Sequence, residues 1–579
     1  MMMTLRQSRI AAGESERGFA LIMVIAIAAV LMILATVAVT YSISGAQKAK
    51  KDQGWNAALS AAYAGIDEYQ SRLSNDTSYT QYGNPAAAFS TGSTVALPTG
   101  TQANPAFGTG TSGTWATISG SGGAAKYRYE VDNSKYSSTG ILRVRATGLA
   151  SGETRTVIAD LKQKGFIDFL YFTDYEIQDP ELSGASPNCV KYKWAGRSGT
   201  CGEIQFGRSD TINGPLHSND TMLICGSTFK GAVTTGNSTP ISGSRLYNIP
   251  GGCGSATFTA GAMTYAPVVG MPSTNSQMKR EARSDLTLLG VPNPGCLYTG
   301  PTSIVFNAGG TMIVRSPWTK ATNVAGDPAS SGSVASGCGT LAQLRSLAGA
   351  TVATPDRNVI YVQNVPAEPT DPNYWGPSMP TTTGYTYACK GASGSGAGNG
   401  IGYPMNNESA PARPTTPYGC TNGDVFVKGS VNGKVTIASE NYVYIIGDIK
   451  YNDSSADMLG LVGNNAVWVW NPVNGNSSLL GNNGRRIDAA ILSVAHTFQV
   501  QNYATWGYRG ILTINGAIAQ KFRGPVGTTS PTGYSKNYVY DARFKYTAPP
   551  KFLSPVTTTY GVSTWMDTAA AFNVDGSYR

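Results

Sequence analysis

This chain contains few residues of the types that commonly act in catalysis. Its 2 histidines are His217 and His496. The segment His217-Ser218-Asn219-Asp220 brings together a base, a hydroxyl and a carboxylate. A catalytic triad depends on the geometry of such groups in space, which adjacency in sequence does not supply, so we interpret this segment as a solvated turn at the end of a strand. His496 is expected in or beside a strand.

Carboxylates are too sparse for glycoside hydrolysis or calcium binding. Enzymes that act on polysaccharides need paired or clustered Asp and Glu, whereas Asp448, Asp453 and Asp457 form no D-x-D array. The sequence contains no P-loop, dinucleotide fingerprint or metal motif. We therefore predict no catalytic residue, no metal, no cofactor and no small-molecule substrate. A cell-surface carbohydrate-active enzyme remains an alternative.

The 8 cysteines point to disulfide chemistry in an oxidising compartment. Their number is even, and no C-x-x-C pair occurs, which favours disulfides over zinc ligands. This many cysteines allow 105 connectivities, and pairing of neighbours along the chain is a working assignment. Free buried thiols are the alternative. The candidate pairs are Cys189 with Cys201, Cys225 with Cys253, Cys296 with Cys338, and Cys389 with Cys420.

An apolar segment near the N-terminus must position everything that follows. From Phe19 to Tyr41 the chain has 23 residues without a charge. A helix rises about 1.5 Å per residue, so this segment is roughly 35 Å long and can cross a hydrocarbon core of about 30 Å. It is longer than the core of a secretory signal, and no small-residue cleavage site follows it. We predict that this segment spans a membrane and is retained.

The same helix is expected to continue to Leu73. Apolar residues recur at steps of three and four, which is typical of a buried stripe along a helix. A helix over residues 19–73 is about 80 Å long, and its second half is expected beneath a globular domain. The stripe consists of Trp55, Leu59, Ala62, Ile66, Tyr69 and Leu73.

Three alternating segments predict a small antiparallel sheet over residues 74–165. They are Tyr127 to Val131, Leu142 to Ala146 and Thr154 to Ala159, and they follow a polar loop region. Their apolar face is expected to cover the helix stripe.

The start of the chain resembles the class III leader of type IV pilin-like proteins. Residues 1–18 are polar and end in Glu16-Arg17-Gly18, directly before Phe19. In that family a prepilin peptidase cleaves after the glycine on the cytoplasmic side and methylates the new N-terminus. The resemblance implies processing between Gly18 and Phe19 and N-methylation of Phe19. An uncleaved membrane anchor is the alternative.

Two further features resemble the minor pilins of the PilX type. Major pilins carry a glutamate at the fifth mature position, where it neutralises the terminal amine of a neighbouring subunit, but this chain has Met23 there. A buried amine without a partner is costly. The segment from Ala57 to Ile66 is similar to the alanine-rich stretch of PilX-type proteins, with Tyr63 in place of a glutamate. The resemblance reaches about residue 165 and implies a minor subunit at a tip position.

The remainder of the chain has the composition of an extracellular β structure. Charged residues make up 13% of the chain, against about 25% in typical soluble proteins, and 69 of the 579 residues are glycine. An apolar-x-Gly-x-apolar pattern recurs at spacings that include 17 and 18 residues, as in successive coils of a β-solenoid. Its members are Ile212 to Leu216, Phe229 to Val233, Val427 to Val431, Val431 to Val435, Ile445 to Ile449 and Ile514 to Ile518.

The sequence therefore predicts a mainly β protein with a long N-terminal transmembrane helix, a small pilin-like antiparallel sheet and a large β-solenoid. The segment from Thr436 to Ile449 resembles the coils of bactofilin-like and parallel β-helix proteins. The solenoid, with loop insertions, is expected over residues 166–535, and a C-terminal cap and tail over residues 536–579. A β-sandwich is the alternative.

These features predict a non-enzymatic minor pilin or pseudopilin. Its expected partners are other pilin-like subunits, a prepilin peptidase and the membrane, with the N-terminus cytoplasmic before processing and the bulk at the cell surface or in a pilus. Loss of a leader with three arginines and two glutamates lowers the net charge only from +9 to +8. A pilus-borne adhesin for a surface ligand, or a DNA-binding module, is the alternative.

Overall fold

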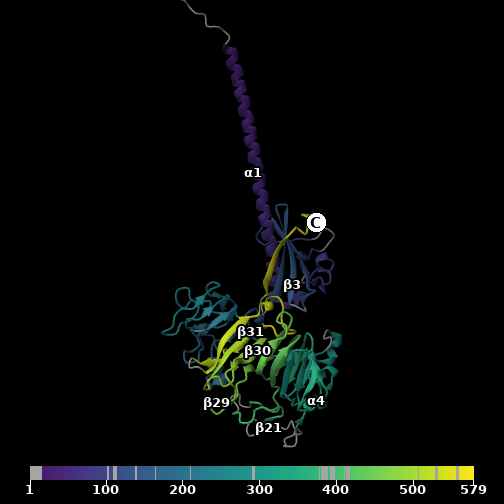
Figure 1. Ribbon diagram of the computed structural model, residues 1–579. Helices are drawn as coiled ribbons and strands as arrows, with labels where there is room; N and C mark the ends of the chain where they lie inside the picture. The colour runs from purple at the N-terminus through teal and green to yellow at the C-terminus, as the bar shows by residue number, and fades with distance from the viewer. Residues whose placement is uncertain are drawn as a thin grey trace, which may run out of the picture. The chain divides into compact units, whose positions relative to one another are not determined.

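The computed structural model describes residues 16–100, 103–108, 114–136, 140–163, 165–208, 210–289, 294–376, 379, 389–391, 398–409, 411, 417–505, 507–528, 532–555 and 560–579. The fold is mainly β, with one long apolar helix at the N-terminus (Figure 1). The chain forms two compact units. The first unit contains residues up to 137, 141–162 and 561–579, and the second contains 138–140 and 163–560. The second unit is therefore an insertion in the sequence of the first.

The helix α1 runs from Glu16 to Asn75 without a break. Its 60 residues contain no proline, so each peptide N–H after the first turn can donate to the carbonyl four residues earlier. Residues 19–53 are exposed, and one face becomes buried from Gly54 onward. The predicted long helix over residues 19–73 is confirmed.

A five-stranded sheet covers the second half of α1. Strands β1 to β4 pair in antiparallel fashion, which confirms the three strands predicted here. Ser151 and Gly152 form the turn between β3 and β4, both with positive φ, as a tight hairpin turn requires. The strand order is β1 (Ala116–Thr117), β2 (Ala125–Asp132), β3 (Ile141–Ala150), β4 (Glu153–Gln163) and β34 (Tyr560–Thr568).

The buried face of α1 differs from the predicted stripe at its first two positions. Trp55 is exposed by 44% and Leu59 is half-buried, whereas the small residues Ala58 and Ala61 are completely buried. A Cβ at Gly148 of β3 would lie 2.0 Å from the carbonyl oxygen of Ala58. The helix and the strand approach so closely here that only small residues fit between them. The other stripe positions are buried as predicted: Ala62, Ile66, Tyr69 and Leu73.

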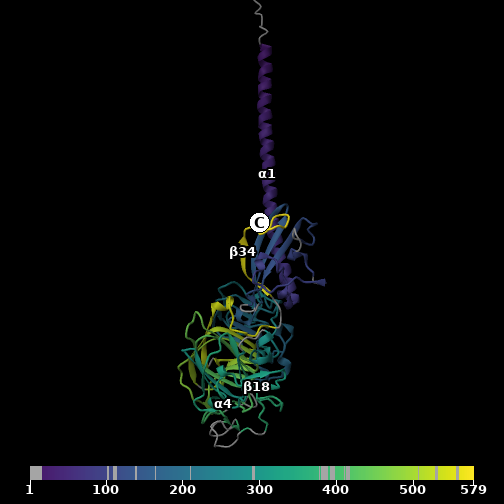
Figure 2. The same cartoon turned by 90° about the vertical axis from the view of Figure 1, so that its right-hand side faces the viewer.

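The C-terminal region corrects the prediction of one solenoid cap over residues 536–579. Strand β33 (Thr532–Tyr540) pairs in parallel within the second unit. Residues 561–579 belong to the first unit, where β34 (yellow in Figure 2) lies beside β4. Prolines in the sequence mark where a ladder stops, but they carry no information about which sheet edge the next strand joins.

Within the described residues, the second unit contains a sheet of 21 strands, most of which pair in parallel. The exceptions are the antiparallel pairs β15–β16, β16–β19 and β32–β33. Besides β33, the strands are β5 (Tyr171–Tyr175), β7 (Thr211–Asn213), β8 (Leu216–Ser218), β10 (Thr228–Phe229), β11 (Val233–Thr235), β12 (Thr257–Phe258), β13 (Thr264–Tyr265), β14 (Cys296–Thr299), β15 (Thr302–Asn307), β16 (Thr311–Arg315), β19 (Ala350–Ala353), β20 (Asn358–Gln363), β23 (Val425–Val431), β24 (Lys434–Ser439), β25 (Tyr442–Tyr451), β26 (Met458–Gly463), β27 (Ala466–Val469), β30 (Arg485–Val500), β31 (Tyr508–Phe522) and β32 (Gly527–Thr528).

Smaller two-stranded sheets complete the second unit. They are β6 (Gln205–Phe206) with β9 (Leu223–Ile224), β17 (Asn323–Ala325) with β18 (Ser331–Ser333), β21 (Cys389–Gly391) with β22 (Gly398–Asn399), and β28 (Val473–Asn474) with β29 (Ser477–Ser478).

The parallel ladders form two arms that meet at β31. One arm leads from β5 through β8 and β11 to β13, alongside β33, β7, β10 and β12. The other leads from β30 through β26, β24 and β20 to β14, alongside β27, β25, β23 and β15. Strand β31 joins the arms because it pairs with β30 on one side and with β33 and then β5 on the other.

Glycine corners explain the sequence pattern in the first arm. Gly214 lies between β7 and β8, and Gly231 lies between β10 and β11, at the equivalent place in the neighbouring layer. A Cβ at Gly231 would lie 2.1 Å from the carbonyl carbon of Gly214. The two corners stack without room for a side chain, which accounts for glycine at positions 17 residues apart.

Candidate functional site

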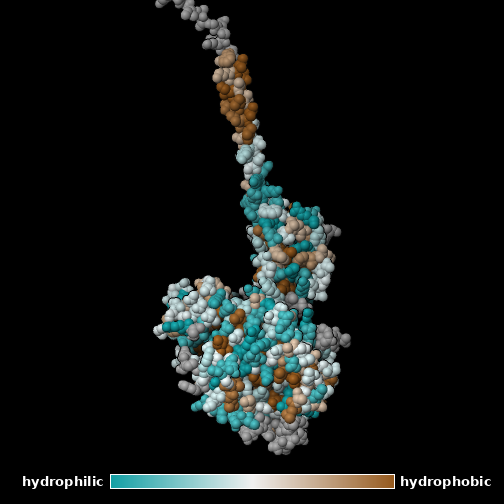
Figure 3. Space-filling model, in the orientation of Figure 1, coloured by the Kyte–Doolittle hydropathy of each residue, from teal (hydrophilic) through white to brown (hydrophobic). Residues whose placement is uncertain are grey.

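The first half of α1 is an uncovered apolar surface. All residues from Phe19 to Tyr41 are exposed, and they form the brown band on the helix in Figure 3. Within the described ranges, α1 is the one helix that is long and apolar enough to cross a membrane. It is compatible with a single-pass membrane anchor.

The predicted processing junction, Gly18 and Phe19, lies in the first turn of α1. Residues 1–15 of the predicted leader lie outside the described residues. The fifth residue after Gly18 is Met23, which is exposed by 57%. This position therefore presents a thioether on the helix surface in place of a carboxylate.

His217 is buried in β8, which corrects the prediction of a solvated turn. Its Nδ1 lies 2.8 Å from Thr234 Oγ1 and its Nε2 lies 2.9 Å from Asn219 Oδ1. The rings of Phe169 and Phe172 pack against the imidazole. The parallel pairing of β8 with β5 and β11 places this segment inside the ladder, a long-range effect that the local sequence does not reveal.

Ser218 and Asp220 are engaged by groups other than the histidine. Ser218 Oγ lies 3.1 Å from Thr173 Oγ1. Asp220 forms an ion pair with Arg197, and both side chains are completely buried. Burial raises the pKa of Asp220, although the Arg197 charge opposes this shift. The partners of the two imidazole nitrogens of His217 are Thr234 and Asn219, rather than the hydroxyl of Ser218 or the carboxylate of Asp220. The segment therefore forms a structural polar network.

His496 lies in β30, as predicted. Its Nδ1 is 2.6 Å from Asp179 Oδ2, and its Nε2 is 3.5 Å from Glu181 Oε2. The Asp179 side chain also accepts a hydrogen bond from the Glu181 N–H at the start of a short helix, α3 (Pro180–Ser183). The pair therefore fastens this helix to the ladder.

The sparse carboxylates do not converge on a cation site. Asp448 pairs with Lys450 at 2.9 Å. Asp457 accepts hydrogen bonds from the backbone N–H groups of Gly433 and Asp453 at 2.7 Å and 2.6 Å. Among the described residues, no group of three or more His, Cys, Asp or Glu side chains is arranged to hold a metal ion.

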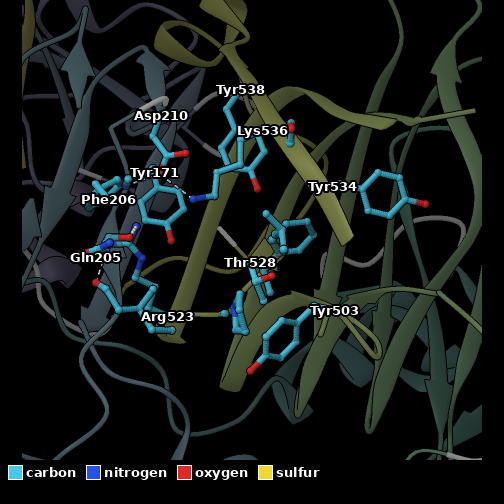
Figure 4. Close-up of a pocket in the computed structure, with 18 of the residues that line it drawn as sticks. Tyr171, Gln205, Phe206, Asp210, Tyr503, Arg523, Thr528, Tyr534, Lys536 and Tyr538 are labelled. Atoms are coloured by element: carbon cyan, nitrogen blue, oxygen red, sulfur yellow. Dashed lines mark hydrogen bonds and ion pairs between the residues drawn. The ribbon is translucent and has the colours of Figure 1, made fainter. Parts of the chain in front are cut away.

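The second unit contains a cavity of about 570 Å³ that the sequence did not predict. It lies where the two arms meet, and residues of β5, β6, β7, β30, β32 and β33 line it, together with the segment that follows β31 (Figure 4). Tyr171 of β5 and Tyr538 of β33 stack within it with ring centroids 6.5 Å apart. Tyr503 and Tyr534 lie on its other side (Figure 4). Tyr171, Tyr503 and the two tyrosines of β33 come from three distant segments, so no local motif signals the cavity.

Two cations of the cavity wall are held by carboxylates. Arg523 Nη1 lies 2.8 Å from Glu176 Oε2, and its guanidinium covers the ring of Phe206 at 3.5 Å. Lys536 Nζ lies 2.8 Å from Asp210 Oδ2. Burial lowers the pKa of Lys536, although Asp210 opposes this shift. For Asp210, burial acts to raise the pKa, but the charge of Lys536 and the hydrogen bonds from Lys536 and from the Gly207 N–H together outweigh it, so the pKa is lowered.

Four disulfides brace the second unit. The bonded pairs are the neighbours along the chain that the sequence analysis used as its working assignment, with Cα atoms 4.8 to 5.7 Å apart. They are Cys189–Cys201, Cys225–Cys253, Cys296–Cys338 and Cys389–Cys420.

Comparison with known proteins finds a distant likeness among solved structures. No protein family matches the sequence. No curated protein matches it either. Among solved structures, the chain is similar to the competence-associated pilin ComZ from Thermus thermophilus at 11% identity, with 89% of this chain and 97% of that chain covered and a TM-score of 0.26. At this TM-score the likeness does not establish a shared fold.

Proposed function

We propose that the chain is a non-enzymatic minor pilin-like subunit of the PilX type. It enters a type IV pilus-like fibre or a related membrane assembly through α1 and presents its second unit outside the membrane. The observation that carries the proposal is the division of α1: an exposed apolar rod of membrane-spanning length continues into a half that is buried beneath an antiparallel sheet. A sheet on the outer half of such a rod is the plan of a pilin.

Burial of apolar side chains supplies the assembly mechanism. Phe19, Ile22 and Ile25 are each more than half exposed on the isolated helix. Lipid covers these side chains in the bilayer and supplies no such gain on helix packing there. In a fibre outside the bilayer, burial of each large apolar side chain among neighbouring pilin helices contributes about 1.5 to 3 kcal/mol relative to exposure to water. The rod then acts as the partner-binding surface, and its neighbours are other pilin-like subunits.

Met23 and the large second unit favour a minor position at the fibre tip. A neighbouring subunit packed against this helix would find no carboxylate at the fifth mature position for its terminal amine. The inserted unit of nearly four hundred residues, 163–560, is also too bulky to repeat along a fibre built of small subunits.

We further propose that the two ladder arms are stacked coils of a β-solenoid. The parallel register of β7 with β10 and of β8 with β11, and the stacked corners at Gly214 and Gly231, support this assignment. Each coil in this region would take about 17 residues, the distance between the two corners. In a solenoid each layer contacts only its neighbours.

In this proposal a prepilin peptidase cleaves between Gly18 and Phe19 and methylates Phe19, and the N-terminus is cytoplasmic before cleavage. The bulk of the chain lies outside the cytoplasm. The disulfides support this orientation, because such bonds persist in oxidising compartments. A role without catalysis is supported by His217, which is committed to packing.

The test is the N-terminus of the mature chain. Mass spectrometry of the protein from cells with an active prepilin peptidase should give a first residue of N-methylated Phe19. Gly18→Val should abolish cleavage, because a branched side chain then precedes the scissile bond. Gly45→Ala is the matched control, since a Cβ at Gly45 meets no atom within 4 Å and cleavage should be unchanged.

Recovery of the uncleaved chain as the stable species beside an active peptidase would overturn the proposal. Cleaved chains that never co-purify with pilin-like subunits would instead keep the processing step and reject the fibre role.

A further inference from the structure

The cavity at the junction of the two arms has a structural origin. Residues 511–516 of β31 pair with β33, whereas residues 518–522 pair with β5. Tyr538 and Val539 are the residues of β33 that pair with β7. The ladder is therefore divided at this layer, and both diverging strands, β5 and β33, contribute to the lining of a cavity of about 570 Å³. This volume lies within the range of pockets that hold small molecules.

The charges of the cavity wall cancel locally. The guanidinium of Arg523 donates to Glu176 and also to the carbonyl oxygens of Ile204 and Gln205, each at 3.2 Å. Lys536 and Asp210 form a second pair. An anionic or cationic ligand would have to break one of these pairs, and an unpaired buried charge is costly. The wall is thus matched to a ligand without net charge.

Aromatic faces and hydroxyl groups make up much of the remaining surface. Tyr171, Tyr503, Tyr534 and Tyr538 line the cavity together with Phe498. Burial raises the pKa of Tyr171, Tyr503 and Tyr538, so their hydroxyls remain protonated and can donate as well as accept. Rings of this kind offer an apolar face and a polar edge. A pyranose ring has the complementary surface, with C–H groups on its faces and hydroxyls at its rim.

We infer that this cavity is a binding site for a short, uncharged saccharide. The ring of Tyr503, which is half-buried and close to the exposed Ala504 and Thr528, forms one wall of the mouth. A sugar ring enters between this side and Tyr534, and its hydroxyls reach the Lys536–Asp210 pair as neutral hydrogen-bonding partners. The inference concerns the second unit and stands independently of the role proposed for α1.

The test is calorimetric titration of the full-length, detergent-solubilised protein with three probes. Cellobiose and diacetylchitobiose are the uncharged probes, and digalacturonate is the anionic one. We expect saturable binding of an uncharged probe, weakened about tenfold or more by Tyr503→Ala, because one stacking face is lost. Ser535→Trp, at an exposed position of the lining, should block binding by filling the mouth.

Tyr508→Ala is the matched control, since Tyr508 is 40% exposed and lies outside the cavity lining. The affinity of the Tyr508→Ala variant for the uncharged probe should equal that of the wild type. Circular dichroism of each variant should show an unchanged fold. Failure of both uncharged probes to bind, tighter binding of digalacturonate, or equal affinity in the folded Tyr503→Ala variant would each overturn the assignment.

Discussion

The two units achieve stability by different means. In the first unit, antiparallel strands lie directly on α1, and the helix-sheet contact is so close that Gly148 abuts the backbone of Ala58. In the second unit, parallel strands stack on one another around apolar side chains, and all four disulfides lie here. The first unit relies on one helix-sheet contact, whereas the second distributes its contacts along two arms.

The two units also differ in their continuity along the chain. The first unit is completed only by residues 561–579, which follow the whole inserted unit. Arg128 of β2 is buried and donates to the carbonyl oxygen of Gly576 at 2.7 Å, and its guanidinium covers the ring of Phe572 at 3.8 Å. The second unit is closed by β31, which pairs with β5 and β33. Both units therefore depend on contacts between residues far apart in sequence.

The largest effect is expected from Gly148→Val. A Cβ at this position would lie 2.0 Å from the Ala58 carbonyl oxygen, so α1 and β3 must separate. The loss of stability of the first unit should exceed about 1 to 3 kcal/mol, which overpacking of a core usually costs. The first unit should therefore unfold while the second stays folded. Hydrogen exchange read by mass spectrometry, peptide by peptide, measures both units at once.

Gly45→Ala serves as the control for this variant, because its Cβ meets no neighbour. Protection of the first unit at wild-type level in Gly148→Val would show that the sheet does not depend on this contact.

Phe572→Ala tests the C-terminal closure of the first unit. The side chain is completely buried beside Arg128, and removal of a buried phenylalanine ring costs about 3 to 5 kcal/mol. Hydrogen exchange of β2 and β4 should accelerate, with no change in β24 or β25. Val574→Ala, at a position exposed by 50%, should have little effect. Acceleration confined to the last residues would contradict the assignment of this segment to the first unit.

Replacement of Cys296 and Cys338 by alanine tests the bracing of the second unit. The bond closes a segment with a sequence separation of 42 residues, and its loss should cost about 2 to 4 kcal/mol. The effect should be confined to urea unfolding of the second unit. The Cys189 and Cys201 pair, with a separation of 12, should give a smaller loss in the chain-entropy description. If the free energy of unfolding of the first unit fell by the same amount, the conclusion that the disulfide stabilises only the second unit would be wrong.

A pH dependence specific to the second unit is also expected. Asp424 is completely buried, and burial raises its pKa to about 7, although hydrogen bonds from Tyr442 N–H and Asn441 oppose the shift. The folded protein keeps this proton up to about pH 7, whereas an unfolded aspartate releases it near pH 3.9. Stability from this group is therefore lost as the pH rises from about 4 to about 7, by about 4 kcal/mol, because the folded and unfolded pKa values differ by about three.

Asp424→Asn should remove this dependence, as measured by urea titrations across that pH range. Asp453→Asn is the control at an exposed carboxylate, where hydrogen bonds from Ser455 lower the pKa. If the free energy of unfolding of the wild type and of Asp424→Asn changed with pH in the same way over this range, the prediction would be wrong.

Local patterns predicted individual elements well. The uncharged run from Phe19 to Tyr41, the stripe positions from Ala62 to Leu73 and the alternation around Tyr127 each arise from neighbouring residues, so they can be read from short windows. The prediction of a buried Trp55 was wrong, because the periodicity was assigned from large apolar residues. The helix face that contacts the sheet there consists of the small residues Ala58 and Ala61. His217 was misplaced because its burial results from the pairing of β8 with distant strands.

The cavity of the second unit had no signal in the sequence. Tyr171, Phe206, Tyr503 and Tyr538 belong to four separate segments, and only the meeting of the two arms brings them together. Nothing in the types or spacing of these residues distinguishes them from other buried aromatic residues.

By itself, the sequence determined the apolar helix, the hairpin strands, the glycine corners and the oxidising chemistry of the cysteines, because each depends on residue type and short spacing. The tertiary structure alone decided that β34 completes the first unit, that β33 lies between β31 and β7, and that a cavity opens at their junction. Every residue except proline offers the same backbone N–H and C=O groups for strand pairing. The hydrogen bonds of a ladder therefore do not reveal in the sequence which distant strand pairs with a given edge.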